Sequence, residues 1–487
     1  MSGGARSSVA AGLLLVFLCA QPRTGLGQAA WEFSPYRVRV RLALEPVPQL
    51  PADIAPQLGK FISARAHTVL GAVWQVESLV APPALRDELL RGGEISPEAI
   101  AAALPDDLAG DKIYLAAISY RAGGYRVAVR ELDCRTRQLS DAFERFAPDM
   151  ADLGTALWDA ALEAFTPVAK IETVDQTRIT ARLRAGGLIV DPASRGLVEK
   201  GMVLRPVIRR NDRSGQPAKL GIQVLPWTLL SVNERRDSLL DTTFHSAFRL
   251  AIPSRGSSRT ERLALLVRPR WPSTRLELRS RGDAAKPLAG YELHIKVPGG
   301  ESEAEPTTEQ KTELIGTTDA DGAVELPRSH EMQLLYVRSG KQLLARLPIL
   351  PGQSQMLLAS VVDDDRRLQA EGLILAMQSR ALDLVARREI LAARFRAKLK
   401  AGQLAEARQL LDAYRKMETR QDLSRDLDQY RQRVASTDRI TQARIDKLFM
   451  DAQQLLTLRP LSDEMLGQLN RELSAAESGG GAKASGS

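Results

Sequence analysis

The feature that most restricts the fold of this chain is a change in its hydrophobic periodicity near Asp363. Over most of the preceding region, apolar residues alternate with polar ones in short runs, the period of two expected of β-strands with one buried face. Beyond Asp363, apolar residues recur three or four positions apart, as they do along one face of an α-helix. The 487-residue chain is therefore expected to fold as several domains, with a helical region at its carboxyl end.

The clearest strand pattern lies near the middle of the chain, at 287–351. Apolar side chains alternate with polar ones along 291–297, and a second alternation follows the turn sequence at 319–322. Asp and Gly in that turn favour a tight connection, because Asp bonds local backbone groups and Gly tolerates a positive φ. The segment is expected to form a compact β module.

The module's sequence, PLAGYELHIKV followed by IGTTDADGAVELP and LLYVRSG, resembles the carboxypeptidase-regulatory-like or transthyretin-like β-sandwich. The resemblance implies an Ig-like fold used as a spacer or adhesion module, and it implies no particular activity. Asp319 and Asp321 raise the alternative of a calcium loop. The fifth and twelfth positions of such a loop hold Ala323 and His330, which do not supply its oxygen ligands, so a plain turn is expected.

The region before this module divides into two parts. Residues 36–168 follow the order strand, helix, strand, helical pieces, two strands and helix. Their motif YLAAISY…GGYRVAVRELDCRTRQLS resembles the small α/β domain at the amino end of TolB-type envelope proteins, with Asp133 in the place of that domain's Asp. The resemblance implies an envelope-associated binding role and not catalysis. Residues 170–286 consist of short alternating runs between Gly, Pro, Asn and Asp, typical of an all-β barrel or sandwich.

The carboxyl-terminal region, 363–460, is expected to be helical. It includes LKAGQLAEARQLLDAYRKM, which resembles one tetratricopeptide-type hairpin. Without a second copy, the motif predicts a helical hairpin and not a solenoid. The remainder, 461–487, ends in a Gly/Ser-rich run and is expected to be a flexible tail.

The first 27 residues are expected to be an export signal. Arg6 precedes an apolar run at 9–20, which is shorter than the roughly 20 residues of a membrane helix. The small residues Gly25 and Gly27 offer a cleavage site. Lipidation at Cys19 and retention of an uncleaved anchor are the alternatives. No later run is apolar and long enough to span a bilayer, so we expect an exported protein, periplasmic or extracellular.

No pattern of reactive residues indicates an enzyme. The four histidines lie far apart, and the chain contains no H-E-x-x-H, C-x-x-C or G-x-S-x-G motif and no P-loop or Rossmann fingerprint. Cys134 follows an alternating run, where a buried thiol is more usual than a nucleophile. We therefore expect no catalytic residue, metal site or cofactor, with an envelope hydrolase that lacks a recognisable motif as an alternative.

Three arginines provide the candidate binding residues. Arg37, Arg39 and Arg41 project from one face of the strand at 36–44. Such a row of guanidinium groups can bind carboxylate or phosphate groups. The alternative is a solvated sheet face or an edge protected by charge.

A second group of arginines lies beside an aromatic residue. The group combines the two types of side chain found in glycan- and nucleic-acid-binding sites: Arg268, Arg270, Trp271 and Arg275. Their Pro-rich setting, RPRWP, favours an interdomain linker.

The predicted fold is multidomain α+β, with an α/β domain, an all-β barrel-like domain, an Ig-like or transthyretin-like β-sandwich and a C-terminal α-helical hairpin region. The expected divisions are 1–27, 36–168, 170–286, 287–351, 363–460 and 461–487. The formal net charge of +8 favours acidic partners. We expect a non-enzymatic binding or scaffold protein of the cell envelope, with an envelope protein or an acidic polymer as partner and no nucleic acid. The alternative is an adhesin-like module that binds polyanions through Arg37, Arg39 and Arg41.

Overall fold

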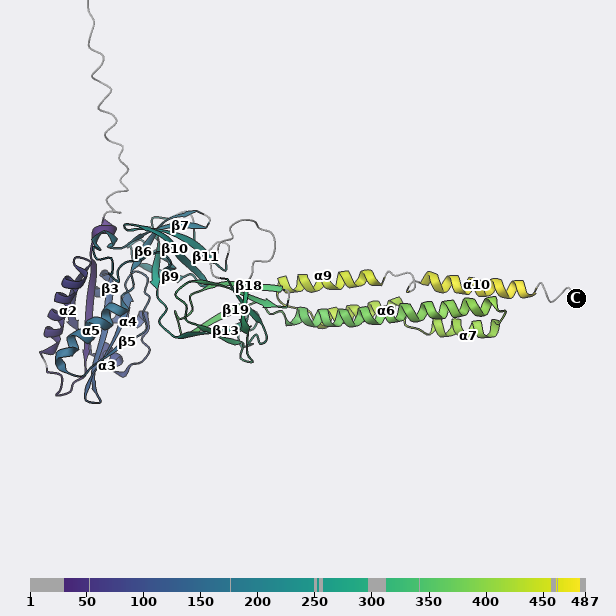
Figure 1. The fold of residues 1–487 in the computed structure, drawn as a ribbon, viewed down its shortest axis with the longest axis horizontal. Helices are drawn as coiled ribbons and strands as arrows, with labels where there is room; N and C mark the ends of the chain where they lie inside the picture. Colours follow the sequence, from purple (N-terminus) through teal and green to yellow (C-terminus); the bar gives the residue numbers. More distant parts are fainter. Residues whose placement is uncertain are drawn as a thin grey trace, which may run out of the picture.

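The computed structural model describes residues 30–481, apart from 52, 176, 249–251, 254–256, 297–311, 341, 457–460 and 462. The predicted export signal, 1–27, lies outside the described residues, as does Val297 of the predicted central strand. Figure 1 shows a broad body of strands and helices that continues into a long rod of helices. The expectation of a multidomain α+β protein is confirmed at this level.

A five-stranded sheet in the order β2-β1-β3-β4-β5 forms the centre of the amino-terminal part. β1 is parallel to β2 and β3, whereas β4 and β5 continue the sheet antiparallel. The strands are β1 (Tyr36–Leu44), β2 (Trp74–Val80), β3 (Lys112–Arg121), β4 (Gly124–Asp133) and β5 (Phe143–Ala147). The helices are α2 (Ile54–Leu70), α3 (Pro83–Arg91), α4 (Pro97–Ala103) and α5 (Met150–Ala164), with the short 3-10 helix η1 (Asp106–Ala109).

Strand β3 is buried on both faces, which explains its almost continuous apolar sequence. Tyr114 and Ala116 belong to the core beneath α2 and α5, and Ile113 and Leu115 belong to a second core beneath α3 and α4. Strands covered by helices on both faces read as hydrophobic runs and not as alternations. The sheet is therefore the rigid middle layer of this domain.

Six strands after this domain close into a barrel. The order β10-β11-β7-β6-β12-β8 returns to its start because β10 also pairs with β8, and β9 adds to the outer part of β8. All six contribute side chains to one core. The strands are β6 (Val168–Asp175), β7 (Arg178–Leu183), β8 (Val203–Asn211), β9 (Pro217–Val224), β10 (Thr228–Arg236), β11 (Leu239–Ser246) and β12 (Thr260–Val267).

The central β module consists of two sheets that share one core. One sheet has the order β16-β13-β19 and the other β15-β14-β17-β18. Two of these strands, β13 and β19, lie outside 287–351 in the sequence, yet both pair within the module. The strands are β13 (Ser273–Ser280), β14 (Glu292–Lys296), β15 (Glu313–Thr317), β16 (Ala323–Pro327), β17 (Gln333–Ser339), β18 (Gln342–Ile349) and β19 (Met356–Val361).

The turn before β16 is closed by its own residues. The carboxylate of Asp319 accepts hydrogen bonds from the backbone N–H groups of Asp321 and Ala323, at 2.9 and 2.8 Å. Gly322 has a φ of 72°, and a Cβ atom there would lie 2.6 Å from the carbonyl oxygen of Leu278. Both observations agree with the predicted plain turn and show why Gly occupies this position.

The rod is built around one long helix, α6 (Asp365–Lys400). Its first half shares a core with α8 and α9, and its second half shares another with α7 and α10. The other helices are α7 (Leu404–Arg415), α8 (Arg420–Arg433), α9 (Arg439–Leu455) and α10 (Asp463–Gly481). In Figure 1, α9 and α10 run alongside α6 on the same side of the rod.

The expectation of a flexible tail over 461–487 is wrong for most of that segment, which forms α10. Leu469 is 1% exposed in a core with residues of α6 and α7, and Met465, Leu466 and Leu473 pack against it. These apolar residues recur at helical spacing ahead of the Gly/Ser-rich end. The composition of the last residues misled the prediction, because it was extended to the helix before them.

Candidate anion-binding cleft

The predicted arginine row on β1 binds acidic groups of the chain itself. Arg39 Nη1 lies 2.7 Å from Asp107 Oδ1, and Arg41 makes two contacts with the same carboxylate, at 2.6 and 2.7 Å. Asp107 belongs to η1 and its side chain is fully buried. Burial opposes ionisation, but hydrogen bonds from Arg41 and Arg39 hold the pKa of Asp107 below its ordinary value.

Arg37 is the exposed member of the row. Its guanidinium donates to the backbone carbonyl of Ala109, and its backbone N–H donates to Asp111 at 3.0 Å. All three arginines of the row therefore make hydrogen bonds to η1 or to Asp111 just after it. An external anion at the predicted site would have to compete with Asp107, which already occupies the two inner guanidinium groups.

A buried charged cluster lies at the base of the same sheet, where the chain passes into the barrel. Lys112 Nζ lies 2.7 Å from Glu131 and 3.0 Å from Asp133, and none of the lysine side chain is exposed. Tyr114 donates to Glu131 at 2.6 Å. Despite its burial, the two carboxylates raise the pKa of Lys112, so the lysine remains charged inside the protein.

Further polar contacts join the α/β domain to the barrel. Arg184, which follows β7, donates to Asp111 at 3.2 Å and to the backbone carbonyls of Trp31, Ser34 and Pro35 at 2.8–3.0 Å. A guanidinium group shared among buried carbonyls fixes the position of the chain segments that supply them. The two domains are therefore held in one orientation at their junction.

A cleft of about 1090 Å³ opens beside this junction. Its walls come from the α/β domain, from the barrel and from the two-sheet module, so no single domain contains it. Arginines are the most numerous charged residues in its lining: Arg195, Arg205, Arg268, Arg270 and Arg328. Clefts between domains are frequent binding sites because they combine shape with groups from several elements.

Two arginines of the cleft are desolvated without a carboxylate partner among the described residues. Arg205 on β8 donates to the side-chain oxygen of Gln353 at 2.9 Å, and burial lowers its pKa. Arg268 donates to the backbone carbonyls of Phe165 and Arg195, each at 2.7 Å. Burial, with the nearby Arg195 charge, lowers the pKa of Arg268 to about 10, and the Glu131 charge offsets only part of this shift. An acidic ligand would stabilise the charged form of each guanidinium group.

Two more arginines in the cleft have unsatisfied donors. Arg195 Nε and Arg270 Nη1 are buried without a hydrogen-bond partner among the described residues, although Asp141 lies 4.0 Å from Arg270 Nη1. The Arg270 guanidinium also lies 4.1 Å from the centre of the Phe143 ring and 4.9 Å from that of Trp271. Buried donors usually find partners, and these donors lie in the wall of the cleft.

Most of the acidic residues that line the cleft already have partners, whereas Glu331 has no ion pair among the described residues. Glu131 and Asp133 bind Lys112, and Glu163 binds Arg145 outside the cleft. Asp141 accepts from Trp271 Nε1 at 3.3 Å. The lining therefore offers arginine donors more readily than a pair of free carboxylates for acid–base chemistry.

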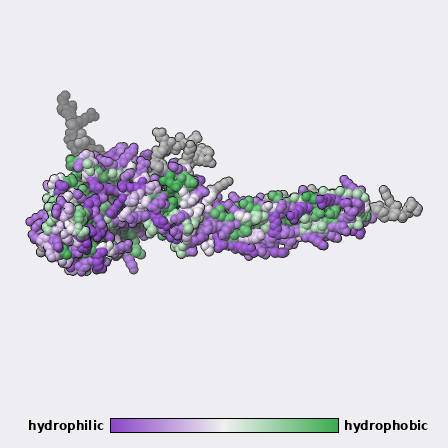
Figure 2. All heavy atoms as spheres, turned by 60° about the horizontal axis from the view of Figure 1, so that its bottom comes forward, coloured by the Kyte–Doolittle hydropathy of each residue, from purple (hydrophilic) through white to green (hydrophobic). Residues whose placement is uncertain are grey.

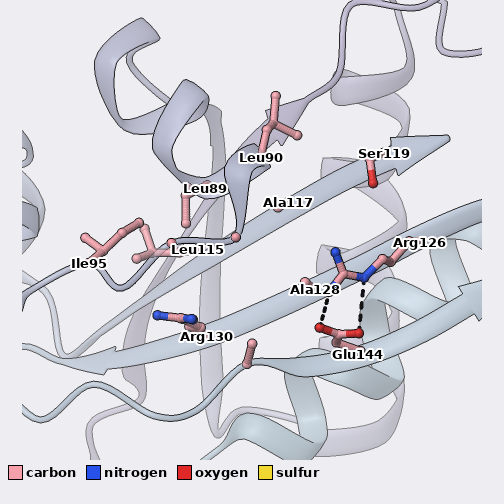
Figure 3. A pocket seen from close by; sticks show the side chains of 13 residues that line it. Leu89, Leu90, Ile95, Leu115, Ala117, Ser119, Arg126, Ala128, Arg130 and Glu144 are labelled. Carbon is pink, nitrogen blue, oxygen red and sulfur yellow. Dashed lines mark hydrogen bonds and ion pairs between the residues drawn. The ribbon is translucent and has the colours of Figure 1, made fainter. Parts of the chain in front are cut away.

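A second hollow is much smaller and lies between α3 and the outer face of the sheet (Figure 3). Its volume is about 70 Å³, and Arg126 there is already bound to Glu144. Arg130 lies against it, with no ion pair among the residues that the structure describes. The hollow has room for only a few waters, so we consider the interdomain cleft the better candidate site.

The remaining site predictions can be compared with the described part of the chain. Cys134 is 1% exposed, and burial raises the pKa of its thiol, which agrees with a structural role and not a nucleophilic one. Across the described residues, no cluster of three or more His, Cys, Asp or Glu side chains is arranged to hold a metal ion. In the same residues, no helix combines the length and the apolar character that crossing a bilayer requires.

The sequence points to part of the cleft but not to Arg205. Arg268 and Arg270 of the predicted arginine–aromatic group line the cleft. Trp271 does not line it, but its Nε1 donates to Asp141 of the lining at 3.3 Å. Arg205 was not singled out. A signal was present, because Arg205 interrupts the apolar run MVLRPVI, and a charged residue inside such a strand is unusual without a partner.

Comparisons with known proteins assign no family. No family model matches the chain, and no curated protein matches it either. The crystal structure of TolB from Acinetobacter baumannii is similar at 12% identity and a TM-score of 0.18, covering 68% of this chain and 96% of that chain. A TM-score this low does not establish a common fold, so the cleft is interpreted from its own residues.

Proposed function

We propose that this chain is an exported, non-enzymatic binding protein of the cell envelope, and that its interdomain cleft holds an acidic peptide segment of another envelope protein. The observation that carries the proposal is the desolvation of Arg205 and Arg268 without acidic partners among the described residues. In the part of the chain that the structure describes, their hydrogen bonds go to neutral oxygens, so the positive charge of each guanidinium group stays uncompensated by an ion pair. An acidic ligand in the cleft would supply the compensating negative charge.

The composition of the cleft favours a peptide over a simple polyanion. Its lining combines the arginines with apolar side chains, among them Trp227, Leu229 and Leu265. A polyanion such as an acidic polysaccharide uses charge and little apolar surface, whereas a peptide with alternating acidic and apolar residues would use both. Envelope location rests on the predicted export signal, and the TolB-like domain and the transthyretin-like module remain proposals that agree with it.

The proposal is tested by affinity capture from the envelope fraction of the source organism with the exported chain as bait. We expect a protein with an acidic segment to be captured by the wild type and lost with Arg205→Gln and Arg268→Gln. Arg210→Gln is the matched control, because Arg210 lies on the same strand β8, is exposed and does not line the cleft. Binding to the captured partner should weaken at least about tenfold in each cleft variant and little in the control.

Other outcomes would contradict the proposal in distinct ways. Equal capture by the wild type and both cleft variants would remove the cleft from the binding site. Retention of an acidic polysaccharide in place of a protein, abolished by moderate salt, would favour the polyanion-binding alternative. Release of a modified product from the captured partner would favour the hydrolase alternative.

A further inference from the structure

Helix α6 carries an apolar stripe on the side that faces away from the rod. We call it the outer stripe, and each of its residues is exposed. It consists of Leu368, Gly372, Leu375, Ser379, Leu382, Ala386, Ile390, Ala393 and Ala397. Steps of three or four residues keep these positions on one line along a helix of 3.6 residues per turn. None of the charged residues of α6 falls on this line.

The outer stripe is not part of the internal packing of the rod. The buried residues of α6, such as Met377, Leu384 and Phe395, lie on the opposite side of the helix and form the two cores with the other helices. Leu375 is 64% exposed and Leu382 is 59% exposed. Figure 2 shows hydrophobic side chains at the surface along the rod. A helix with two opposite apolar faces needs two sets of partners.

The alternation of residue size along the outer stripe favours a second copy of the same helix as its partner. Leucine or isoleucine alternates with glycine, serine or alanine over most of the stripe. In a pair of such helices, the large side chains of one copy can lie over the small residues of the other, and the backbones approach closely. A partner with leucines throughout would leave the small positions poorly filled.

The length of the outer stripe is sufficient for a reversible pair. From Leu368 to Ala397 it extends about 44 Å at about 1.5 Å per residue, close to the four heptads that a coiled coil requires. With a helix about 10 Å wide, two copies would bury a total of about 900 Å² in projection. This area is below the roughly 1,200 Å² of stable interfaces and is typical of weak, reversible complexes.

Charges beside the outer stripe favour antiparallel pairing. On one flank, Glu371 lies in the first half of α6 beside Arg367, and Arg396 lies in the second half beside Glu472. Glu371 and Arg396 would therefore each share their charge between a partner in their own chain and one in the other copy. Two antiparallel copies centred near Leu382 bring Glu371 of each copy opposite Arg396 of the other. Parallel copies would instead place each of these charges beside its own equivalent.

We propose that the protein forms a homodimer through the outer stripe, with the two copies of α6 antiparallel. The pairing joins two rods side by side and places the two strand-rich bodies at opposite ends. Each dimer then carries two interdomain clefts, one in each body. The dimer does not depend on what the clefts bind.

The test is the mass of the exported chain in solution, measured by sedimentation equilibrium or by light scattering after gel filtration. We expect the wild type at twice the 53.3 kDa chain mass or slightly less, and the double variant Leu375→Glu with Leu382→Glu as a monomer. The dissociation constant should rise at least about 100-fold, because each dimer loses four apolar contacts and gains four buried charges. Far-UV circular dichroism should be unchanged, since both leucines are exposed in one copy.

Met450→Glu is the matched control. Met450 is 62% exposed on α9 of the same rod and lies outside the outer stripe, so this variant should remain a dimer. A wild type that is monomeric at about 100 µM, far above the micromolar range of weak specific complexes, would overturn the proposal. So would a double variant that stays dimeric.

Crosslinking tests the orientation of the pair. Ser379→Cys and Ala386→Cys are made as separate variants, and the native Cys134 is buried. Antiparallel helices bring position 379 of one copy to position 386 of the other, so a mixture of the variants should form a disulfide dimer that neither forms alone. A disulfide dimer within each separate variant would indicate parallel helices and contradict the antiparallel arrangement.

Discussion

At the scale of single residues, Lys112 holds together the base of the α/β domain. It is fully buried between Glu131 and Asp133, and it also donates to the backbone carbonyl of Thr166 at 2.5 Å. Removal of the lysine leaves two carboxylates in a buried site without a cation. The ion pairs of Lys112 with Glu131 and Asp133 therefore stabilise the observed join between the sheet and the barrel.

We expect Lys112→Met to lower the free energy of unfolding by about 3–5 kcal/mol, the usual effect of removing one partner of a buried ion pair. Chemical denaturation followed by fluorescence would measure it. Arg126→Met is the control on the neighbouring strand β4: its ion pair with Glu144 is about half exposed, and such pairs contribute at most about 1 kcal/mol. A similar loss in both variants would contradict the role assigned to Lys112.

His245 makes the structure sensitive to acid. It lies on β11 with Nε2 2.9 Å from the Ser231 hydroxyl, and burial, with the charge of Arg346, lowers its pKa to about 4. The folded state thus favours the neutral ring, whereas the unfolded chain protonates near pH 6.5. Its contribution to stability is present above about pH 6.5 and is lost as the pH falls towards 4.

We expect the free energy of unfolding to fall between pH 6.5 and pH 4 by at most about 3 kcal/mol, because solvent at the partly buried ring reduces the full effect. Denaturation curves at several pH values would show the slope. The His245→Gln variant keeps a hydrogen-bonding side chain without this titration, so its slope should be clearly smaller. An unchanged slope in that variant would assign the acid sensitivity to other groups.

At the scale of elements, the sequence predicts local structure better than assembly. The alternation of apolar and polar residues identified most strands, and heptad-like spacing identified the helices, because both depend on neighbours in the chain. The recruitment of β13 and β19 to the central module depends on pairing across about 80 residues, which no local pattern encodes. The Gly/Ser-rich composition of the chain end also led to a prediction of a flexible tail where the preceding apolar residues form α10.

The candidate site was less predictable than the fold, because it depends on contacts between residues far apart in the sequence. Arg41 is 66 positions from Asp107, so the sequence displayed a row of arginines but not the carboxylate that occupies it. The cleft arises only where three domains meet, and Arg205 in its lining resembles an isolated irregularity in a strand when the sequence is read alone. Long-range placement, and not residue type, decides which arginines are available to a ligand.

The helical character of α10 leads to a prediction at this scale. We expect Leu469→Asp to detach α10 from α6 and α7, because it places a charge in a core where Leu469 is 1% exposed. Hydrogen–deuterium exchange should show protected amides at 464–477 in the wild type and rapid exchange in the variant. Ala475→Asp, at an exposed position of the same helix, should leave the protection unchanged; fast exchange in the wild type would refute the packing of α10.

At the scale of the whole molecule, the body and the rod have separate cores. The rod's cores contain only residues from 370 onwards, and its base is attached through a few polar contacts. Lys286 lies 2.7 Å from Asp365, and the Tyr291 hydroxyl accepts from the backbone N–H of Asp364 at 2.9 Å. Few contacts of this kind couple two cores weakly, so the parts should unfold in separate steps.

We therefore expect at least two calorimetric transitions for the exported chain. Phe395→Ala removes a 1% exposed side chain from a core of the rod, and Leu230→Ala removes a fully buried one from the barrel. Each substitution costs about 2–5 kcal/mol and should lower only the midpoint of its own transition, by several degrees. A single transition that both variants shift equally would mean that body and rod fold as one unit. Binding of a ligand in the cleft would then also stabilise the rod and its outer stripe.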